Sequence, residues 1–201
     1  LANVVNTLTT AHPVYDRVEI LEDDQFTVGA IDAKLAELAP NFVVDVHVLT
    51  HGDASSIGPD GQVTSADIED FANIPGLHLG AVYQQNCFGG ALRSAWRTAG
   101  AQVVNGTRHI NYGYMAYPDF LSRWLTGETF GGAVAESLTD STPIIRVIHG
   151  FLDTHIENFT TGGFTTRHPP QFSVTGSLSP NDELRASAQR FRGNRNLRVT
   201  D

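Results

Sequence analysis

Apolar segments of two different periods alternate along the chain, and this alternation limits its fold more than any other feature. Continuous or alternating apolar runs predict strands, and apolar residues spaced three or four apart predict helices. Strands are predicted at residues 15–21, 42–50, 77–83, 101–105 and 144–148, and helices at 28–38, 64–73, 91–99, 118–125 and 132–138. Strands that alternate with helices build βαβ units. The sequence therefore predicts an α/β fold with a mostly parallel central sheet and helices on both faces.

The first half of the chain carries the clearest local signals. The run of valines in 42–50 suits a central strand that is covered on both faces. His47 within this run is interpreted as a core histidine with satisfied hydrogen bonds. A Gly-Pro-Asp-Gly turn in 53–62 predicts a small hairpin. Thr64 followed by Asp67 resembles a capping box and predicts the start of a helix.

The composition excludes several classes of protein. With 201 residues and 41% hydrophobic residues, the chain is long enough for one compact domain with a sizeable core. Cys87 is the only cysteine, which excludes an internal disulfide and a cysteine-based structural zinc site. The net charge of -9 repels nucleic acids, and no apolar stretch approaches the roughly 20 residues of a transmembrane helix. We therefore expect no nucleic-acid and no membrane partner, whereas a basic peptide or protein would be attracted.

Two chemically reactive side chains follow the strongest predicted strands. His51 comes directly after the valine-rich strand, Cys87 follows the strand at 77–83, and glycines lie close to both. In an open α/β sheet, ligands bind at the carboxyl ends of the strands, where loop amides and helix N-termini converge. Either residue alone fits a structural role. Together, on neighbouring strands, they predict a rim at which an imidazole assists a thiol nucleophile.

The segments around this pair resemble those of the caspase-like (clan CD) cysteine peptidases, a group that includes caspases, metacaspases, legumains, gingipains, clostripains and separase-related domains. The shared features are an apolar strand that ends in His-Gly (VVDVHVLTHG, 43–52) and a second that ends in a cysteine (LHLGAVYQQNCFGG, 77–90). The stretch 85–89 is similar to the caspase signature Gln-Ala-Cys-x-Gly, with asparagine in the alanine position. The resemblance covers roughly residues 15–150 and implies a three-layer caspase-like fold. The histidine-to-cysteine interval is shorter than the roughly 50 residues of caspases, which favours a relative of caspases.

The resemblance implies a hydrolase, more specifically a thiol protease that acts as a cysteine-type endopeptidase. Cys87 would attack the scissile carbonyl as a thiolate, and His51 would act as base and then protonate the leaving amine. The amides of Gly52 and Cys87 would form the oxyanion hole. No third catalytic residue is assigned. Asp45 and Asp53 lie near His51 in the sequence, and Asp53 is interpreted as a turn-capping carboxylate.

Substrate-binding residues are predicted on both sides of the dyad. Gln85 and Asn86 directly precede the cysteine, and Gln85 has the position that lines the pocket for the residue before the cut in caspases. Arg108, His109 and Tyr112 follow the next predicted strand and are expected to form the other wall. Arg108 or His109 would favour an acidic side chain there, but both fit equally well as solvated loop residues. The substrate is therefore predicted to be a peptide or protein, with its preferred residue left open.

The catalytic domain is predicted to span residues 1–161, and 162–201 to form a peripheral hairpin or loop and a polar, arginine-rich tail. Within this second part, 182–191 is compatible with a short helix. Caspase-like sheets usually begin with a strand before the first helix, whereas residues 1–10 already have a helical pattern. That first strand is thus missing, trimmed or supplied elsewhere, and another chain or a fragment of the same precursor is an expected partner.

Two other functions remain open on the sequence alone. A catalytically silent caspase-like scaffold or interaction domain would keep the dyad without a competent pocket. A transamidase or other acyl transferase would use the same Cys87 and His51. No cofactor is expected. Metal binding is not expected either, because His149 and His155 have no carboxylate at ligand spacing.

Overall fold

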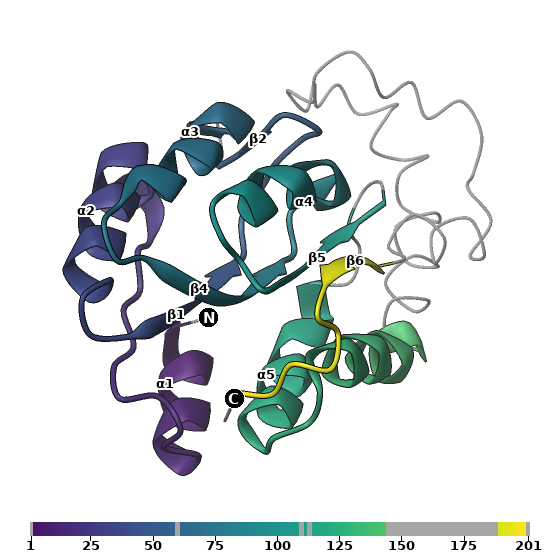
Figure 1. Cartoon of the computed structure of the whole chain (residues 1–201). Coiled ribbons are helices and arrows are strands. Elements are labelled where there is room, and N and C mark those ends of the chain that lie inside the picture. Colours follow the sequence, from purple (N-terminus) through teal and green to yellow (C-terminus); the bar gives the residue numbers. More distant parts are fainter. Residues whose placement is uncertain (1, 59–60, 109–110, 112–113, 144–188, 200–201) are drawn as a thin grey trace, which may run out of the picture.

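A four-stranded sheet forms the centre of the computed structural model (Figure 1). The structure describes residues 2–58, 61–108, 111, 114–143 and 189–199. The strands are β1 (Val43–Val48), β4 (His78–Gln84), β5 (Val103–Thr107) and β6 (Gln189–Gly193), and they lie in that order across the sheet. β4 pairs in parallel with β1 and with β5, while β6 is antiparallel to β5. The predicted α/β fold with a mostly parallel sheet is confirmed.

Helices cover both faces of the sheet. They are α1 (Ala2–Ala11), α2 (Val28–Leu38), α3 (Ser65–Asp70), α4 (Gly89–Thr98), α5 (Tyr117–Leu125), the short 3-10 helices η1 (Asp23–Gln25), η2 (Phe71–Asn73) and η3 (Tyr114–Ala116), and the helical residues 130–143. In Figure 1, α2, α3 and α4 lie over one face, and α1, α5 and the helix at 130–143 lie over the other. None of the described helices is long and apolar enough to cross a lipid bilayer.

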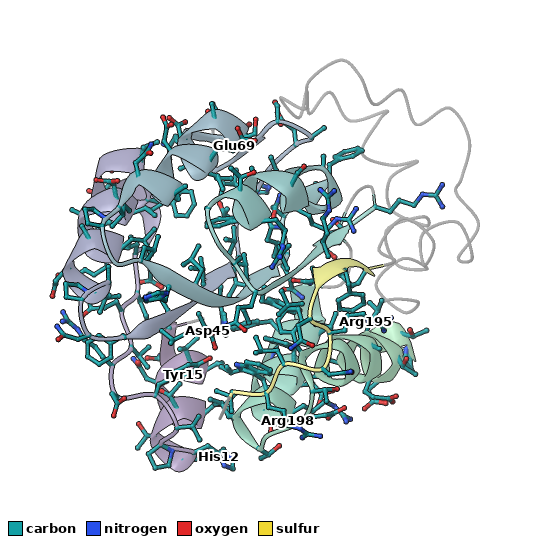
Figure 2. The ribbon with its side chains drawn as sticks, in the orientation of Figure 1. His12, Tyr15, Asp45, Glu69, Arg195 and Arg198 are labelled. Carbon is teal, nitrogen blue, oxygen red and sulfur yellow. The ribbon has the colours of Figure 1, made fainter. Side chains whose placement is uncertain are left out.

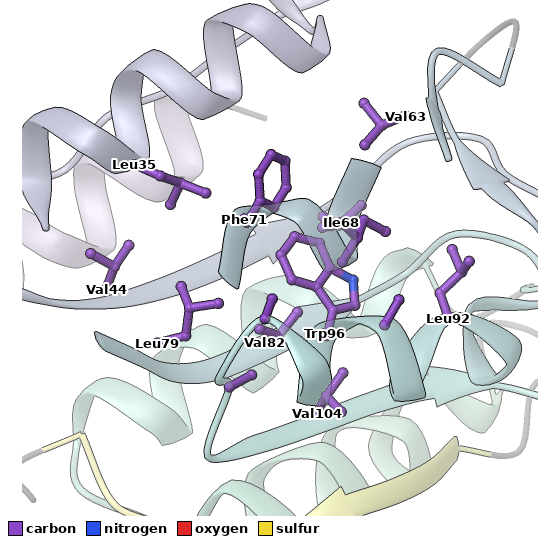
Figure 3. Close-up of a cluster of buried hydrophobic side chains, with 14 of the residues drawn as sticks. Leu35, Val44, Val63, Ile68, Phe71, Leu79, Val82, Leu92, Trp96 and Val104 are labelled. Carbon is purple, nitrogen blue, oxygen red and sulfur yellow. The ribbon is translucent and has the colours of Figure 1, made fainter. Parts of the chain in front are cut away.

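One face of the sheet packs against an apolar layer around Trp96 of α4 (Figure 3). The ring centroids of Trp96 and Phe71 are 6.1 Å apart, and Leu79 and Val82 of β4 belong to the same buried layer. The indole Nε1 of Trp96 donates a hydrogen bond to Gln84 Oε1 at 3.0 Å. Fully burying one such side chain contributes roughly 1.5–3 kcal/mol. This layer therefore holds α3 and α4 firmly on β4.

The opposite face packs against an aromatic layer. The ring of Tyr83 stacks on that of Phe120 from α5, with centroids 3.8 Å apart and planes at 16°. Phe130 meets Phe120 and Trp124 edge-on, at centroid distances of 5.7 and 5.6 Å. Such aromatic pairs add roughly 0.5–1.5 kcal/mol beyond the area that they bury. Together the two layers enclose β4, which is buried along nearly its whole length.

A carboxylate joins three distant parts of the chain beside β1. Figure 2 shows Asp45 and Tyr15, and Asp45 accepts hydrogen bonds from Tyr15 Oη at 2.7 Å and from the Ala81 amide at 2.6 Å. Trp124 Nε1 donates to Tyr15 Oη at 2.8 Å. Burial raises the pKa of Tyr15 well above its ordinary value, and the negative charge of Asp45 adds to the rise. The network fastens the segment before α2 to the sheet and to α5.

Several elements form where the sequence predicts them. α2 has the predicted bounds, and the predicted hairpin is the antiparallel pair β2 (Ser56–Ile57) and β3 (Val63–Thr64). The predicted capping box starts α3, because the Thr64 hydroxyl accepts from the Asp67 amide and the Asp67 carboxylate accepts from the Thr64 amide. These elements depend on local interactions, which a local pattern can predict.

Other expectations about single elements are wrong. Residues 15–21 form no strand, since no described strand pairs with them, and β1 therefore lies at the edge of the sheet instead of its centre. Residues 189–191, at the end of the expected helix 182–191, belong to β6, because pairing with β5 overrides their local preference. The predicted strand at 144–148 lies outside the described residues.

Candidate active site

The parallel pairing of β1 and β4 brings the ends of these two strands to one rim of the sheet. Val48, the last residue of β1, pairs with Gln84, the last residue of β4, and the next amide, that of Gln85, donates to the Val48 carbonyl at 2.8 Å. His51 and Cys87 each follow three positions after the end of their strand. His51 and Cys87 therefore lie in the loops that follow two neighbouring strands, at the same rim of the sheet, as the sequence predicts.

The loop that carries His51 is held by the short hairpin that follows it. The His51 carbonyl accepts a hydrogen bond from the Gly58 amide at 2.9 Å, and Gly52 forms a β-bridge with Ile57. These backbone contacts fix the loop from one side and leave the His51 side chain exposed to solvent. An exposed imidazole at this position is accessible to a substrate and able to exchange protons with water.

Asp53 stabilises the same loop as a turn-capping residue, which confirms its interpretation from the sequence. One carboxylate oxygen, Oδ1, accepts hydrogen bonds from the amides and hydroxyls of Ser55 and Ser56 at 2.7–3.1 Å. Partial burial would raise the pKa of Asp53, but these hydrogen bonds outweigh it and hold the pKa below its ordinary value. Asp45 accepts hydrogen bonds from the Tyr15 hydroxyl and from the Ala81 amide of β4.

Cys87 lies in a tight turn between β4 and α4. The turn passes through Phe88, which has a φ of 55° and is the one non-glycine residue with positive φ in the described part of the chain. A left-handed conformation costs a residue with a Cβ roughly 1–3 kcal/mol and often marks a functional turn. Cys87 is half-buried and lies two residues before the first residue of α4. The N-terminus of a helix stabilises nearby negative charge, such as that of a thiolate.

The backbone amides that would stabilise an oxyanion are free at this rim. Within the described residues, the N–H groups of Gly52 and Cys87 donate to no acceptor. Most backbone N–H groups in folded proteins are paired. Two unpaired donors that flank the same pair of strand ends are therefore available to a ligand, at the two positions predicted for an oxyanion hole.

Asn86 connects the two loops beneath the rim, a role that sequence reasoning missed. Its side chain is fully buried, and its Nδ2 donates to the Cys87 carbonyl at 3.2 Å. A Cβ placed on Gly52 would lie 2.8 Å from Asn86 Nδ2, and one on Gly89 would lie 2.9 Å from Asn86 Oδ1. That Oδ1 atom has no hydrogen-bond partner in the part of the chain that the structure describes. Asn86 thus packs between the histidine loop and the cysteine turn instead of facing a substrate.

The glycines after the cysteine allow α4 to begin directly against β5. A Cβ on Gly90 would lie 2.6 Å from the Thr107 carbonyl oxygen, and one on Gly106 would lie 2.4 Å from the Gly89 backbone. Distances this short leave no room for any side chain at these positions. The Thr107 hydroxyl also donates to the Asn86 carbonyl at 2.8 Å. The end of β5 therefore braces the cysteine turn from the side opposite β1.

Asn111 contacts the cysteine directly and was also missed by sequence reasoning. Its backbone amide donates to Cys87 Sγ at 3.4 Å, and its Nδ2 donates to the Gln85 carbonyl at 2.7 Å. This contact places the loop after β5 directly against the cysteine sulfur. The signal in the sequence is only its place in the loop after β5, where the residues named for substrate binding were Arg108, His109 and Tyr112.

The predicted substrate-binding residues have different surroundings. Gln85 is buried, and its side chain Nε2 donates to the hydroxyl of Tyr83 at 2.8 Å. Arg108 is exposed at the end of β5. His109 and Tyr112 lie outside the described residues. Gln85 and Asn86 therefore lie in the turn that carries Cys87, whereas Arg108 is at the surface.

His47 lies below the rim and is only partly satisfied. Its Nδ1 is 2.8 Å from the Tyr117 hydroxyl, while its buried Nε2 has no partner among the described residues. Burial lowers the pKa of His47 to about 4, and the nearby charge of Asp45 opposes the shift only in part. His47 is therefore neutral at physiological pH. The prediction that this core histidine has its hydrogen bonds satisfied is confirmed for Nδ1 and is wrong for Nε2 among the described residues.

Within the described residues, no three histidine, cysteine, aspartate or glutamate side chains cluster to hold a metal ion. Comparison with protein-family models, curated proteins and solved structures finds no match to this chain. The functional assignment therefore rests on the chemistry and geometry of the rim formed by His51, Gly52, Asn86 and Cys87.

Proposed function

We propose that this chain is a cysteine endopeptidase with a caspase-like fold and a catalytic dyad of His51 and Cys87. One observation carries the proposal, namely the parallel pairing of β1 and β4, which ends both strands at one rim. The amides of Gly52 and Cys87, which donate to no acceptor among the described residues, the N-terminus of α4 and the Asn111 amide support it, because backbone N–H groups and helix N-termini stabilise negative charge.

The proposed reaction proceeds through a thioester. His51 takes the proton of the Cys87 thiol, and the sulfur attacks the carbonyl carbon of the scissile bond. The negative charge that develops on the carbonyl oxygen is stabilised by the amides of Gly52 and Cys87. When the tetrahedral intermediate collapses, the C–N bond breaks and the leaving amine takes the proton from His51. Water, deprotonated by His51, then attacks the thioester carbonyl and releases the acid and the thiol.

The proposal is tested by Cys87→Ala and His51→Ala in the full chain. Incubation with a mixed peptide library, followed by mass spectrometry of the products, measures cleavage and identifies the residue before each cut. We expect cleavage to fall by roughly 10³-fold or more in both variants, because nucleophile and base act as a unit. The half-buried thiol makes few contacts, so thermal stability should change little.

His78→Ala is the matched control. His78 is an exposed histidine at the other end of β4, and its replacement should leave cleavage unchanged. Full cleavage by Cys87→Ala would overturn the proposal. Products joined to an added amine, without hydrolysed products, would instead identify an acyl transferase. An absence of any product together with slow alkylation of Cys87 by iodoacetamide would identify a silent scaffold.

A further inference from the structure

The outer edge of β1 is unpaired in the part of the chain that the structure describes. β1 pairs only with β4 among the described strands, and no described backbone group bonds to its other edge. An edge strand presents a row of free N–H and C=O groups that accept a further strand. Natural proteins usually protect such an edge with charges, prolines or a covering element. β1, VVDVHV, holds one charged residue, Asp45, whose carboxylate already accepts hydrogen bonds from Tyr15 and Ala81.

A cavity of about 760 Å³ lies beside this edge. It is bounded by β1 on one side and by residues 14–22 on the other, with α1, α2 and α5 contributing further lining. A strand residue in a packed sheet occupies roughly 3.3 Å along the strand, 4.8 Å between strands and 10 Å between layers, or about 160 Å³. The cavity, which we call the β1 slot, therefore has room for a segment of about five residues.

Exposed apolar side chains concentrate at the β1 slot. The large hydrophobic residues that are exposed in the described part of the chain are Val14, Val18, Val43 and Met115, at 38, 39, 65 and 43% exposure. All except Met115 line the slot. Scattered apolar residues on a protein surface need no explanation, but a group around one unpaired strand edge indicates a surface that is covered in the functional state.

The polar groups of the β1 slot indicate the chemistry of what covers it. At its rim, Arg17 and Lys34 are each paired with Glu19 and Glu37, so their charges are already compensated. Asp45 accepts hydrogen bonds from Tyr15 and Ala81 and is not available to an occupant. Asp16 and Glu22 also line the slot and form no ion pair among the described residues, so an acidic occupant would be repelled. An uncharged apolar strand would complement the exposed valines.

His47 adds one specific requirement. It lines the β1 slot, and its buried Nε2 lacks a partner among the described residues. A buried unpaired nitrogen costs roughly 1–3 kcal/mol. A polar group carried by an occupant, such as a backbone amide or a threonine hydroxyl, would remove that cost.

We propose that the β1 slot receives an extended, uncharged, apolar strand from a partner polypeptide, which pairs with the free edge of β1 and lies between β1 and residues 15–21. Its backbone groups would satisfy the edge of β1, and its side chains would cover Val14, Val18 and Val43. Residues 15–21, extended by sequence pattern but unpaired in the structure, would then gain a neighbour on the slot side. This proposal does not depend on the peptidase function.

The test uses a fluorescein-labelled peptide with the sequence Gln-Thr-Val-Ile-Val-Thr-Gln, in which the uncharged polar ends serve only to keep it in solution. Fluorescence anisotropy with the full chain should give saturable binding. Val18→Asp and Val43→Asp place a charge in the slot at exposed positions that tolerate it, and each should weaken binding by about tenfold or more. Met115→Asp introduces the same charge at an exposed apolar residue outside the slot and should bind as the unmodified chain does.

Hydrogen exchange locates the bound peptide. Saturating peptide should slow amide exchange in both β1 and residues 15–21, since an inserted strand has a neighbour on each side. Absence of saturable binding, equal binding by Val18→Asp and Val43→Asp, or protection confined to other segments would overturn the proposal. A dimer seen by light scattering in the absence of peptide, and lost in Val43→Asp, would overturn it in favour of a second copy of this chain as the occupant.

Discussion

Gly52 illustrates how a single position controls the rim. It adjoins His51, offers a free amide, and lies so close to Asn86 and Ser56 that a Cβ would fall 2.8 and 2.9 Å from their atoms. The glycine is therefore required by its contacts and not by its own backbone angles. Any side chain at this position must push the histidine loop away from the cysteine turn.

Gly52→Ala should accordingly impair both stability and activity. Because the neighbouring atoms include a backbone carbonyl and a buried amide, we expect unfolding to become easier by about 1–3 kcal/mol. Under the proposed mechanism, peptide cleavage should also fall by more than about tenfold, since the loop shift moves the proposed oxyanion donor. Urea denaturation and the peptide-library assay measure the two effects.

Gly29→Ala provides the comparison for that substitution. Gly29 lies in α2, and a Cβ added there would have no other atom within 4 Å, so the same change meets no obstacle. Alanine in a helix is favoured over glycine by up to about 1 kcal/mol, and the variant should be as stable or more stable. Equal behaviour of the two variants would mean that contact with Asn86 does not constrain Gly52.

At the same scale, the sequence predicts the residues of the proposed site better than the residues that support them. His51, Gly52 and Cys87 follow from strand ends and glycines, which are local features. The roles of Asn86 and Asn111 depend on contacts with loops from other parts of the chain, and no spacing along the sequence predicts those contacts. Asn86 in particular has the position that suggested a substrate contact, yet its side chain packs beneath the rim.

Among the elements, α3 is the most clearly encoded. Its start is fixed by reciprocal hydrogen bonds between Thr64 and Asp67, and its own residue Ile68 is fully buried. The same cannot be said of β1, whose valines predict a central strand although it lies at an edge. The apolar pattern of a strand indicates how much of its surface is buried. Its position in the sheet depends instead on which other strands pair with it.

Asp67→Ala should lower the free energy of unfolding by about 1 kcal/mol, the usual value of an N-terminal cap interaction. Hydrogen bonds from the Thr64 side chain and backbone hold the pKa of Asp67 below its ordinary value. Its stabilisation is therefore present above the ordinary aspartate pKa and is lost as the pH falls through the lowered value. The difference between the two proteins should shrink in strong acid.

Asp70→Ala serves as the control for this prediction. Asp70 is exposed at the other end of α3 and makes no side-chain capping bond. Urea denaturation at pH 7 should give a smaller change for Asp70→Ala than for Asp67→Ala. An equal loss in the two variants would show that the capping box is not the source of the effect.

For the whole molecule, the layered arrangement follows from the alternation of strands and helices, but strand order does not. The sequence predicts a sheet between two helical layers, and the structure confirms it. It does not reveal that β6, near the end of the chain, pairs with β5. Pairing between segments this far apart depends on the assembled core, so it cannot be predicted from the sequence of either segment alone.

The buried histidine makes the stability of the whole molecule depend on pH. Because the pKa of His47 is about 4 in the folded chain and roughly 6.5 when unfolded, only the unfolded state takes up a proton between these values. Stability should therefore fall as the pH drops from about 6.5 to 4, by up to about 3 kcal/mol. Above pH 7 the group is neutral in both states and contributes no pH dependence.

His47→Gln should remove most of this slope, as measured by urea denaturation at pH 7, 6, 5 and 4. His78→Gln, at an exposed histidine of β4, should retain it. A slope that is the same in His47→Gln as in the unmodified chain would assign the acid sensitivity to other groups, such as Asp53 and Asp67, whose pKa values are lowered.

The two tryptophans of the sequence lie on opposite faces of the sheet, Trp96 in the layer with α4 and Trp124 in the layer with α5. Each is therefore an intrinsic optical probe of one layer. In Trp96→Phe the remaining tryptophan is Trp124, which is hydrogen-bonded to Tyr15. In Trp124→Phe it is Trp96, which is hydrogen-bonded to Gln84, directly below the cysteine turn. Red shifts that differ between these single-tryptophan proteins would report which layer loosens first, without any attached dye.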